Sequence, residues 1–164
     1  MMEKTTIEIS LSTPADYAGL IEIDHLVWNL TTTPSPDIRW DSPEDYGKRH
    51  PAGSQLVARC NGKVCGYIFF QDATPLPTNQ HVADLAMAVH PDFQGQNIGF
   101  ELMRVVEEVA RDNGKRKLSL RVLSCNEKAI RFYKKCGYQE QGRLVEEFYL
   151  EGRFVDDLLL FKHI

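Results

Sequence analysis

Metal-binding and redox motifs are absent from this sequence, which contains only four cysteines. Their positions are Cys60, Cys65, Cys125 and Cys136, with no CxxC pair and no histidine partners at zinc-like spacing. We therefore expect no bound metal and four free thiols, as in a reducing cytoplasm. A chain of 164 residues buries enough apolar surface to fold without metals or disulfides.

Long apolar runs and an excess of positive charge are missing as well. No stretch reaches the roughly 18 apolar residues of a membrane span, and residues 1–10 lack the apolar core of a secretory signal. Acidic residues outnumber basic ones by 23 to 19, and we expect the basic run at 115–117 to form a solvated turn. These features exclude membrane and nucleic-acid partners and predict a cytoplasmic protein.

The remaining composition is that of a soluble globular protein. Hydrophobic residues make up 43% and charged residues 26% of the chain, and no repeat, linker or low-complexity tract interrupts it. Because this length suits one domain, we expect residues 1–164 to form a single domain.

Alternation of apolar and polar residues predicts the strands of the first half. Residues 7–11 alternate as one strand, and Asn61-Gly62 within 55–71 is typical of a hairpin turn. Residues 81–90 are apolar on both strand faces, which predicts a central strand buried on both sides.

Helical periodicity and capping residues predict four helices. Their expected starts are Pro14, Pro43, Ile98 and Asn126. Glycines just past the helix ends, as in Asn113-Gly114, agree with the last two. A strand at 118–122 follows the third helix and a hairpin at 142–161 closes the chain, so the order strand, helix, strand implies a parallel crossover.

The most informative segment is VHPDFQGQNIGFELM at residues 89–103, where the expected central strand ends and a long helix begins. The first N–H groups of a helix have no internal acceptors and lie at the positive end of its dipole, so they suit a phosphate. Gly95 and Gly99 let the backbone approach a ligand closely. A tight turn without a ligand stays open as the alternative.

Two nucleotide-binding motifs fail on spacing in this segment. The dinucleotide fingerprint GxGxxG needs a third glycine, and the P-loop needs a lysine directly after its last glycine, here Gly99. Neither residue is present, so both classes of nucleotide site are excluded.

Gln94, Asn97 and Gly99 fall on a pattern of Gln or Arg, two residues, Gly, one residue, and Gly or Ala. The segment thereby resembles motif A of the GNAT superfamily, the acetyl-CoA-dependent N-acetyltransferases. Asn97 stands where the family usually has its first glycine. Asparagine is among the non-glycine residues that best tolerate left-handed backbone geometry, so the departure leaves the motif usable.

A second segment carries the same resemblance independently. NEKAIRFYKKCGY at 126–138 looks like the family's N-x-x-A-x-x-(F/L)-Y-x-x-x-G-(F/Y) region, and the closing DDLLLFK looks like its final strand. The resemblance covers nearly the whole chain. It implies the GNAT-type acyl-CoA N-acyltransferase fold, an α+β (α/β mixed sheet) architecture with about seven strands and four helices, splayed at the fourth and fifth strands.

The resemblance also implies a binding site for acetyl-CoA (CoA) as co-substrate. Main-chain amides of the loop would hold the CoA diphosphate, the strand backbone before it would pair with the pantetheine arm, and two residues of the second segment would complete the site. In chain order these residues are Met87, Ala88, Val89, Gln94, Gly95, Gln96, Asn97, Ile98, Gly99, Phe100, Asn126 and Phe132.

Tyr133 is implied as the general acid at the departing CoA sulfur. A phenol with a pKa of about 10 is a weaker acid than a thiol at about 8.5, so we expect Tyr133 to act mainly by hydrogen bonding to the developing thiolate. Asp84 and His81 on the central strand are the candidates for the general base. We place Asp84 first, with a structural hydrogen-bond acceptor as the alternative.

The implied reaction is direct acetyl transfer from acetyl-CoA to a primary amine of a small molecule or peptide, by an enzyme that needs no metal. Dimers are frequent in the family, so a homodimer stays open. Asp24, Trp28 and Asn29 are candidates for lining the amine site, because a carboxylate attracts an ammonium and an indole can flank a chain. Two alternatives stay open, a non-catalytic module that binds or senses acyl-CoA and a protein N-terminal acetyltransferase.

Overall fold

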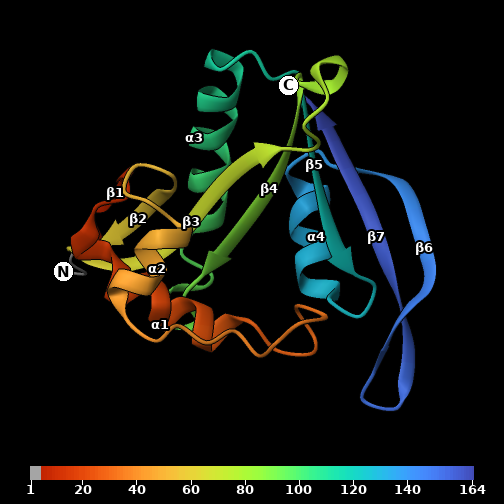
Figure 1. Cartoon of the computed structure of the whole chain (residues 1–164), viewed down its shortest axis with the longest axis horizontal. Helices are drawn as coiled ribbons and strands as arrows, with labels where there is room; N and C mark the ends of the chain where they lie inside the picture. Colours follow the sequence, from red (N-terminus) through yellow and green to blue (C-terminus); the bar gives the residue numbers. More distant parts are fainter. Residues whose placement is uncertain (1–4) are drawn as a thin grey trace. The chain divides into compact units, whose positions relative to one another are not determined.

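The computed structural model describes residues 5–164 and contains seven strands and four α-helices over this range (Figure 1). The strands are β1 (Ile7–Leu11), β2 (Leu56–Cys60), β3 (Lys63–Asp72), β4 (Val82–Val89), β5 (Lys117–Leu123), β6 (Gln139–Leu150) and β7 (Arg153–His163). The helices are α1 (Tyr17–Val27), α2 (Pro43–Arg49), α3 (Ile98–Asp112) and α4 (Glu127–Lys135). The expected set of strands and helices is confirmed.

The strands form one mixed sheet in the order β1-β2-β3-β4-β5-β7-β6. β4 pairs in parallel with β5, where Val82–Asp84 lies opposite Lys117–Ser119. β7 pairs antiparallel with β5 and with β6, so β6 lies at the edge of the sheet. The predicted mixed α+β sheet with its parallel crossover is confirmed. Over the described range, no helix is both long and apolar enough to cross a membrane.

The chain divides into two compact units whose segments alternate along the sequence. Unit 1 comprises the described residues of Met1–Val27 together with Ile38–Phe69 and Ala86–Val106. Unit 2 comprises Trp28–Asp37, Phe70–Leu85 and Glu107–Ile164. The single domain of residues 1–164 stays a prediction.

In unit 1, an ion pair joins the start of α1 to β2. Arg59 Nη2 lies 2.5 Å from Asp16 Oδ2, Arg59 Nε donates to Asp16 Oδ1 over 2.9 Å, and the Thr13 N–H donates to Asp16 Oδ2 over 2.8 Å. Burial alone would raise the pKa of Asp16, but the hydrogen bonds from Arg59 and Thr13 hold it below its usual value. The 3₁₀ turn at Pro14–Asp16 that leads into α1 is thereby fixed to the sheet.

Local capping signals in unit 1 act as the sequence indicates. Ser42 Oγ accepts the N–H of Asp45 over 3.1 Å and starts α2, with Pro43 as its first residue. Asn61 and Gly62 have φ values of 50° and 84°, the left-handed pair that a two-residue hairpin turn requires. The predicted hairpin is confirmed.

Unit 2 contains the hairpin of β6 and β7 and the two elements that precede it in the chain, β5 and α4. Asn126 Oδ1 accepts the Ala129 N–H over 3.3 Å at the start of α4, and Gly137 takes a φ of 95° after its end. Leu123, Leu150 and Val155 form a buried cluster, against which the partly buried Cys125 packs. The four cysteines of the chain are free thiols.

Two expectations about burial are wrong. Lys115 is not in a solvated turn: it is 9% exposed, and its Nζ donates to the Asp72 carboxylate and, over 2.6 Å, to the Gln80 carbonyl. A carboxylate and a carbonyl together satisfy the ammonium, which permits its burial. In β4 only Ala83 and Ala88 are buried, and the other six residues keep accessible surface. The apolar residues on both faces of β4 predicted a strand buried on both sides, but most of its residues are only partly buried.

Candidate functional site

The loop between β4 and α3 lies wholly in unit 1 and has the backbone geometry that the motif requires. From β4 the chain passes through His90 and a 3₁₀ turn, Pro91–Phe93, and α3 begins at Ile98. Gly95 and Asn97 have φ values of 80° and 66°, both in the left-handed region. Asn97 thus adopts the conformation for which the family pattern usually provides glycine.

This loop presents main-chain donors to solvent. Within residues 5–164, no group accepts a hydrogen bond from the N–H of Gly95, Gln96 or Asn97, and all three residues are exposed. The first amides of α3 add donors at the positive end of the helix dipole, because the bonded turn starts with Glu101 N–H to the Asn97 carbonyl, at 3.2 Å. A row of donors with two left-handed residues fits the diphosphate of CoA.

Close packing holds the base of this loop in place. Ile98, the first residue of α3, is buried, and a Cβ at Gly66 of β3 would lie 3.0 Å from Leu102 Cδ1 and 3.2 Å from the Ala88 carbonyl oxygen. A larger residue at this position would need Leu102 or the β4 backbone to shift by a few tenths of an ångström, so glycine suits this close approach. The sequence analysis missed Gly66, although a glycine inside a strand pattern is a signal of close backbone approach.

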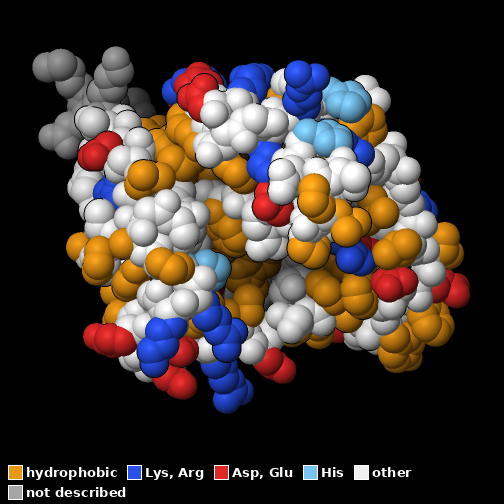
Figure 2. Space-filling model, turned by 45° about the horizontal axis from the view of Figure 1, so that its top comes forward, with side chains coloured by type: hydrophobic (Ala, Val, Ile, Leu, Met, Phe, Trp, Pro, Cys, Tyr) orange, Lys and Arg blue, Asp and Glu red, His pale blue; other side chains and the backbone are white. Residues whose placement is uncertain are grey.

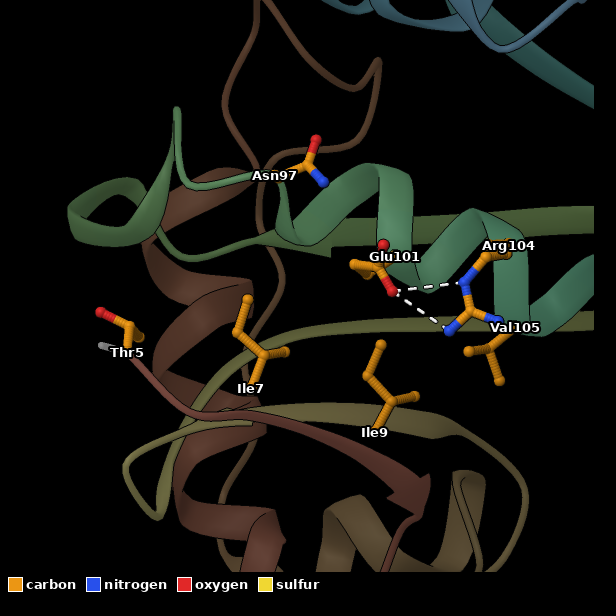
Figure 3. A pocket seen from close by; sticks show the side chains of 7 residues that line it. All are labelled: Thr5, Ile7, Ile9, Asn97, Glu101, Arg104 and Val105. Carbon is orange, nitrogen blue, oxygen red and sulfur yellow. Dashed lines mark hydrogen bonds and ion pairs between the residues drawn. The ribbon is translucent and has the colours of Figure 1, made fainter.

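A cavity of about 420 Å³ lies between β1 and α3 in unit 1 (Figure 3). Its lining residues are Thr5, Ile7, Ile9, Asn97, Glu101, Arg104 and Val105. Glu101 Oε2 accepts from Arg104 Nη2 over 3.1 Å, so these two side chains neutralise each other beside the cavity. Asn97 alone of the predicted cofactor residues lines it, and the cavity offers no net positive charge for a phosphate.

In unit 2, Tyr133 presents a hydroxyl that is available to a ligand. The side chain is partly buried beside Phe132 and Tyr138, with ring centroids 5.3 and 5.7 Å away. Across the described chain, no residue forms a hydrogen bond with its hydroxyl oxygen. Burial, and next the nearby Cys136 thiol, raises the pKa of Tyr133 above its ordinary value. Tyr133 is thus a poor source of a free proton and a suitable hydrogen-bond donor.

Asp84 of β4 faces Ser119 of β5 across the parallel pair, and both lie in unit 2. The Ser119 hydroxyl donates to Asp84 Oδ1, which fixes the orientation of the carboxylate. This contact agrees with the structural-acceptor alternative, while the second carboxylate oxygen stays available for other chemistry. His81, the other candidate base, is exposed one residue before β4 and contributes its carbonyl to the N–H of Arg116 over 2.8 Å.

The other predicted cofactor residues lie in two places, the end of β4 with the loop after it, and α4 with its cap. Met87, Ala88 and Val89 end β4, and His90 and the turn Pro91–Phe93 connect them to the loop of Gln94–Phe100. Asn126 uses its side-chain oxygen as the cap of α4, and Phe132 packs against Tyr133. The structure thus places the strand and loop residues together in unit 1, and Asp84, Asn126, Phe132 and Tyr133 in unit 2.

Asp24 and Asn29, two of the candidates for lining the amine site, form hydrogen bonds with other residues of the protein. Asp24 is 5% exposed, and its carboxylate accepts from Trp40 Nε1 over 2.8 Å and from Tyr67 Oη over 2.7 Å. Asn29 Oδ1 accepts from the N–H of Thr31 over 2.9 Å within the loop after α1. Sequence reasoning missed Trp40 and Tyr67, because no local pattern links residues this far apart.

Comparisons with known proteins agree with the motif resemblance. The family model described as "Acetyltransferase (GNAT) family" matches residues 20–138. The L-amino acid N-acyltransferase MnaT of Escherichia coli (strain K12) is 28% identical over 159 residues, which cover 92% of this chain and 90% of that protein.

Solved structures share the fold over nearly the whole chain. A protein from Streptococcus mutans UA159 superposes with a TM-score of 0.85 at 26% identity, covering 95% of this chain and 98% of that one. A protein from Salmonella typhimurium, solved with its cofactor acetyl-CoA, gives a TM-score of 0.82 at 23% identity and covers 96% of this chain and 94% of that one.

The left-handed backbone at Asn97 gives a direct test of the loop. Asn97→Val puts a β-branched side chain at a φ of 66°, so we expect the loop to distort and the Kd for CoA to rise about tenfold. Asn97→Gly adopts the same φ without strain and is expected to keep the Kd within about twofold of wild type. Isothermal titration calorimetry with CoA measures both. Equal affinity of the Val and Gly variants would contradict the assignment of the diphosphate to this loop.

Proposed function

Because this chain belongs to the acetyltransferase (GNAT) family, we propose that it transfers the acetyl group of acetyl-CoA to the primary amine of a small molecule, with amino acids as the first class to examine. The protein is an acetyl-CoA-dependent N-acetyltransferase. The observation that carries the cofactor site is the row of main-chain donors at Gly95–Asn97, ahead of α3. The amino-acid class is supported by the name of the Escherichia coli relative MnaT, an L-amino acid N-acyltransferase.

The loop and the strand before it would hold the cofactor. Amides between Gln94 and Phe100 would bind the diphosphate, and the backbone of Met87–Val89 would pair with the pantetheine arm. The accessible surface along β4 supports this use of the strand. When bound, acetyl-CoA supplies a thioester carbonyl that a neutral amine attacks.

Tyr133 would donate a hydrogen bond to the sulfur as the C–S bond breaks. Its hydroxyl has no hydrogen-bond partner within residues 5–164, and its raised pKa keeps the proton on the phenol. A donor that keeps its proton stabilises negative charge that develops on sulfur only in the transition state, and this lowers the barrier without tightening ground-state binding.

Asp84 would receive the proton that the attacking amine loses. An α-amine with a pKa of about 8 is about one-tenth neutral at pH 7, so the base is needed mainly during attack, when the nitrogen becomes positively charged. The Ser119 hydroxyl would hold one carboxylate oxygen and leave the other to accept the proton.

An acceptor screen tests the proposed function, with Tyr133→Phe as the matched variant. We expect CoA thiol release from acetyl-CoA to rise above background hydrolysis with at least one amine in a panel of amino acids, polyamines and peptides. With that amine, Tyr133→Phe is expected to lower kcat by about 10²-fold, because it loses only the donor to sulfur. Its Kd for CoA should match wild type in calorimetry.

The outcomes of the screen separate the competing functions. Acetyl-CoA binding without turnover on any amine would favour a non-catalytic acyl-CoA-binding module. Turnover on peptides alone would favour a protein N-terminal acetyltransferase. Unchanged kcat in Tyr133→Phe would remove this tyrosine from the mechanism, whichever acceptor is found.

Asp84→Asn and Ser119→Ala test the base together. If Asp84 accepts the proton, Asp84→Asn lowers kcat/KM for the amine by about 10²-fold and removes the pH dependence that the carboxylate contributes. Ser119→Ala keeps the carboxylate and is expected to lose less than about tenfold. An Asp84→Asn rate equal to wild type over the whole pH profile would leave Asp84 as a structural acceptor.

We also propose a homodimer, supported by exposed apolar side chains on the hairpin of β6 and β7. Tyr149 and Phe154 are 65% and 62% exposed with ring centroids 5.0 Å apart, and Val145, also on β6, is exposed as well. In Figure 2, hydrophobic side chains gather at the lower right, over this hairpin. Apolar surface on an edge hairpin suits contact with an identical copy. A cytoplasmic location is proposed as well, since free thiols suit a reducing compartment.

Sedimentation equilibrium measures the proposed dimer. Wild type is expected to sediment at twice the chain mass, and Tyr149→Ser with Phe154→Ser to shift the protein toward monomer. Leu76→Ser, which removes an exposed leucine outside the hairpin, is the control and should leave the mass unchanged. A wild-type monomer at micromolar concentration, or a dimer insensitive to the hairpin variants, would contradict the proposal.

A further inference from the structure

His90 links β4 to the donor loop and is among the most buried polar residues of the chain. It is 2% exposed, in contrast to the exposed loop residues that follow it. Its main chain joins two neighbours: the His90 N–H donates to the Cys65 carbonyl of β3 over 2.8 Å, and its own carbonyl accepts the Phe93 N–H over 2.9 Å. The residue therefore lies where the sheet ends and the loop begins.

The His90 side chain caps the turn that leads to the loop. Its Nδ1 accepts the N–H of Asp92 over 3.1 Å, and its ring meets Phe93 edge-on with centroids 5.6 Å apart. Pro91 has no N–H of its own, so the imidazole satisfies the first free main-chain donor after the strand.

The same hydrogen bond defines the state of the ring. An Nδ1 that accepts must be unprotonated, so the neutral ring carries its proton on Nε2. Nε2 lies 3.6 Å from Glu22 Oε1 of α1, and Asp92 Oδ2 lies 4.0 Å from Nδ1. Within residues 5–164 Nε2 forms no hydrogen bond, so the side chain is positioned by the bond between Nδ1 and the Asp92 N–H and by its packing.

We propose that His90 is a positioning residue for acetyl-CoA: by accepting the Asp92 N–H it fixes the turn Pro91–Phe93, and with it the direction of the free amides at Gly95–Asn97. The inference rests on the proposed cofactor site. Donors fixed before binding need no reordering when the diphosphate arrives, so the cap strengthens binding without touching the ligand. His90 itself takes no part in proton transfer or acetyl transfer.

This role requires an acceptor atom at the Nδ1 position and no further imidazole chemistry. Asparagine carries Oδ1 on Cγ, as histidine carries Nδ1, and an Asn side chain commonly accepts the N–H two residues ahead. Glutamine places its oxygen one bond farther out and misses that position. Alanine has no acceptor. The three substitutions therefore distinguish the effect of the hydrogen bond from the effects of side-chain polarity and side-chain size.

Calorimetry with CoA and steady-state kinetics with acetyl-CoA test the proposal. His90→Ala and His90→Gln are expected to raise the Kd for CoA and the KM for acetyl-CoA about tenfold, and His90→Asn to restore both to within about threefold of wild type. The kcat at saturating acetyl-CoA should stay within about twofold in all three, because the chemistry is untouched. His25→Ala, which removes an exposed histidine of α1, should match wild type throughout.

The proposal is overturned if His90→Ala binds CoA as tightly as wild type, or if His90→Asn is as weak as His90→Ala. Should His90→Ala fail to fold, the comparison of His90→Asn with His90→Gln decides, since both keep a polar side chain at the site. Amide hydrogen exchange at Asp92 in the ligand-free protein gives a readout without cofactor: protection is expected to fall in the Ala and Gln variants and return in Asn. Exchange that is equal in all variants would also overturn it.

Failure of the cofactor site itself is distinguishable by the Asn97 variants. If Asn97→Val leaves the Kd for CoA unchanged, the loop is not the diphosphate site and the parent assignment fails. If Asn97→Val weakens binding and His90→Ala does not, the loop assignment holds and only the role of His90 is rejected.

Discussion

The accessible main-chain donors just before α3 are the constraint on which the proposed function of this protein depends. Backbone N–H groups that find no acceptor in the protein are tolerated only where water or a ligand satisfies them. Here Gly95 and Asn97 turn the chain through left-handed geometry, and the buried Ile98 holds the helix end below. The glycine at position 66 of β3 lets the supporting strand approach. The left-handed geometry and the accessible donors are the features that the proposed diphosphate site would use, and the packing at Ile98 and Gly66 supports the base of the loop.

In the proposed function, cofactor binding and chemistry use different parts of the chain. The proposed binding depends on main-chain amides, which every residue except proline supplies, and Asn97 takes the left-handed backbone that the loop needs. The proposed chemistry depends on single side chains such as Tyr133. The raised pKa of Tyr133 follows from its burial, and it directs this residue toward hydrogen bonding rather than proton release. A family resemblance carried by the loop therefore supports cofactor use more directly than it supports any one catalytic residue.

Features that depend on neighbouring residues were predictable from the sequence. Ser42, Asn126 and Asn61-Gly62 act through hydrogen bonds or φ values within three residues, and each took its predicted place. Contacts between distant segments were not predictable. Arg59 reaches Asp16, Tyr67 reaches Asp24 and Lys115 reaches Asp72, each across 43 residues of sequence. From the sequence alone a charged residue is expected to be exposed. It can be buried only where a partner from a distant segment satisfies its charge, and such partners are not visible in the sequence. The sequence therefore predicted an exposed Lys115, whereas the fold buries it.

His90 shows how a local signal can be present in a sequence without being recognised. Histidine is not among the usual N-capping residues. Here, however, its Nδ1 accepts the Asp92 N–H from the position that the side-chain oxygen of an asparagine would take. The His90 side chain is 2% exposed, so its hydrogen bond to the Asp92 N–H competes less with water than a bond from an exposed cap would. The amides of Gly95–Asn97 that follow the turn stay exposed. A main-chain anion site needs both a fixed turn and exposed N–H donors. In this chain the two would meet at the segment that begins with His90.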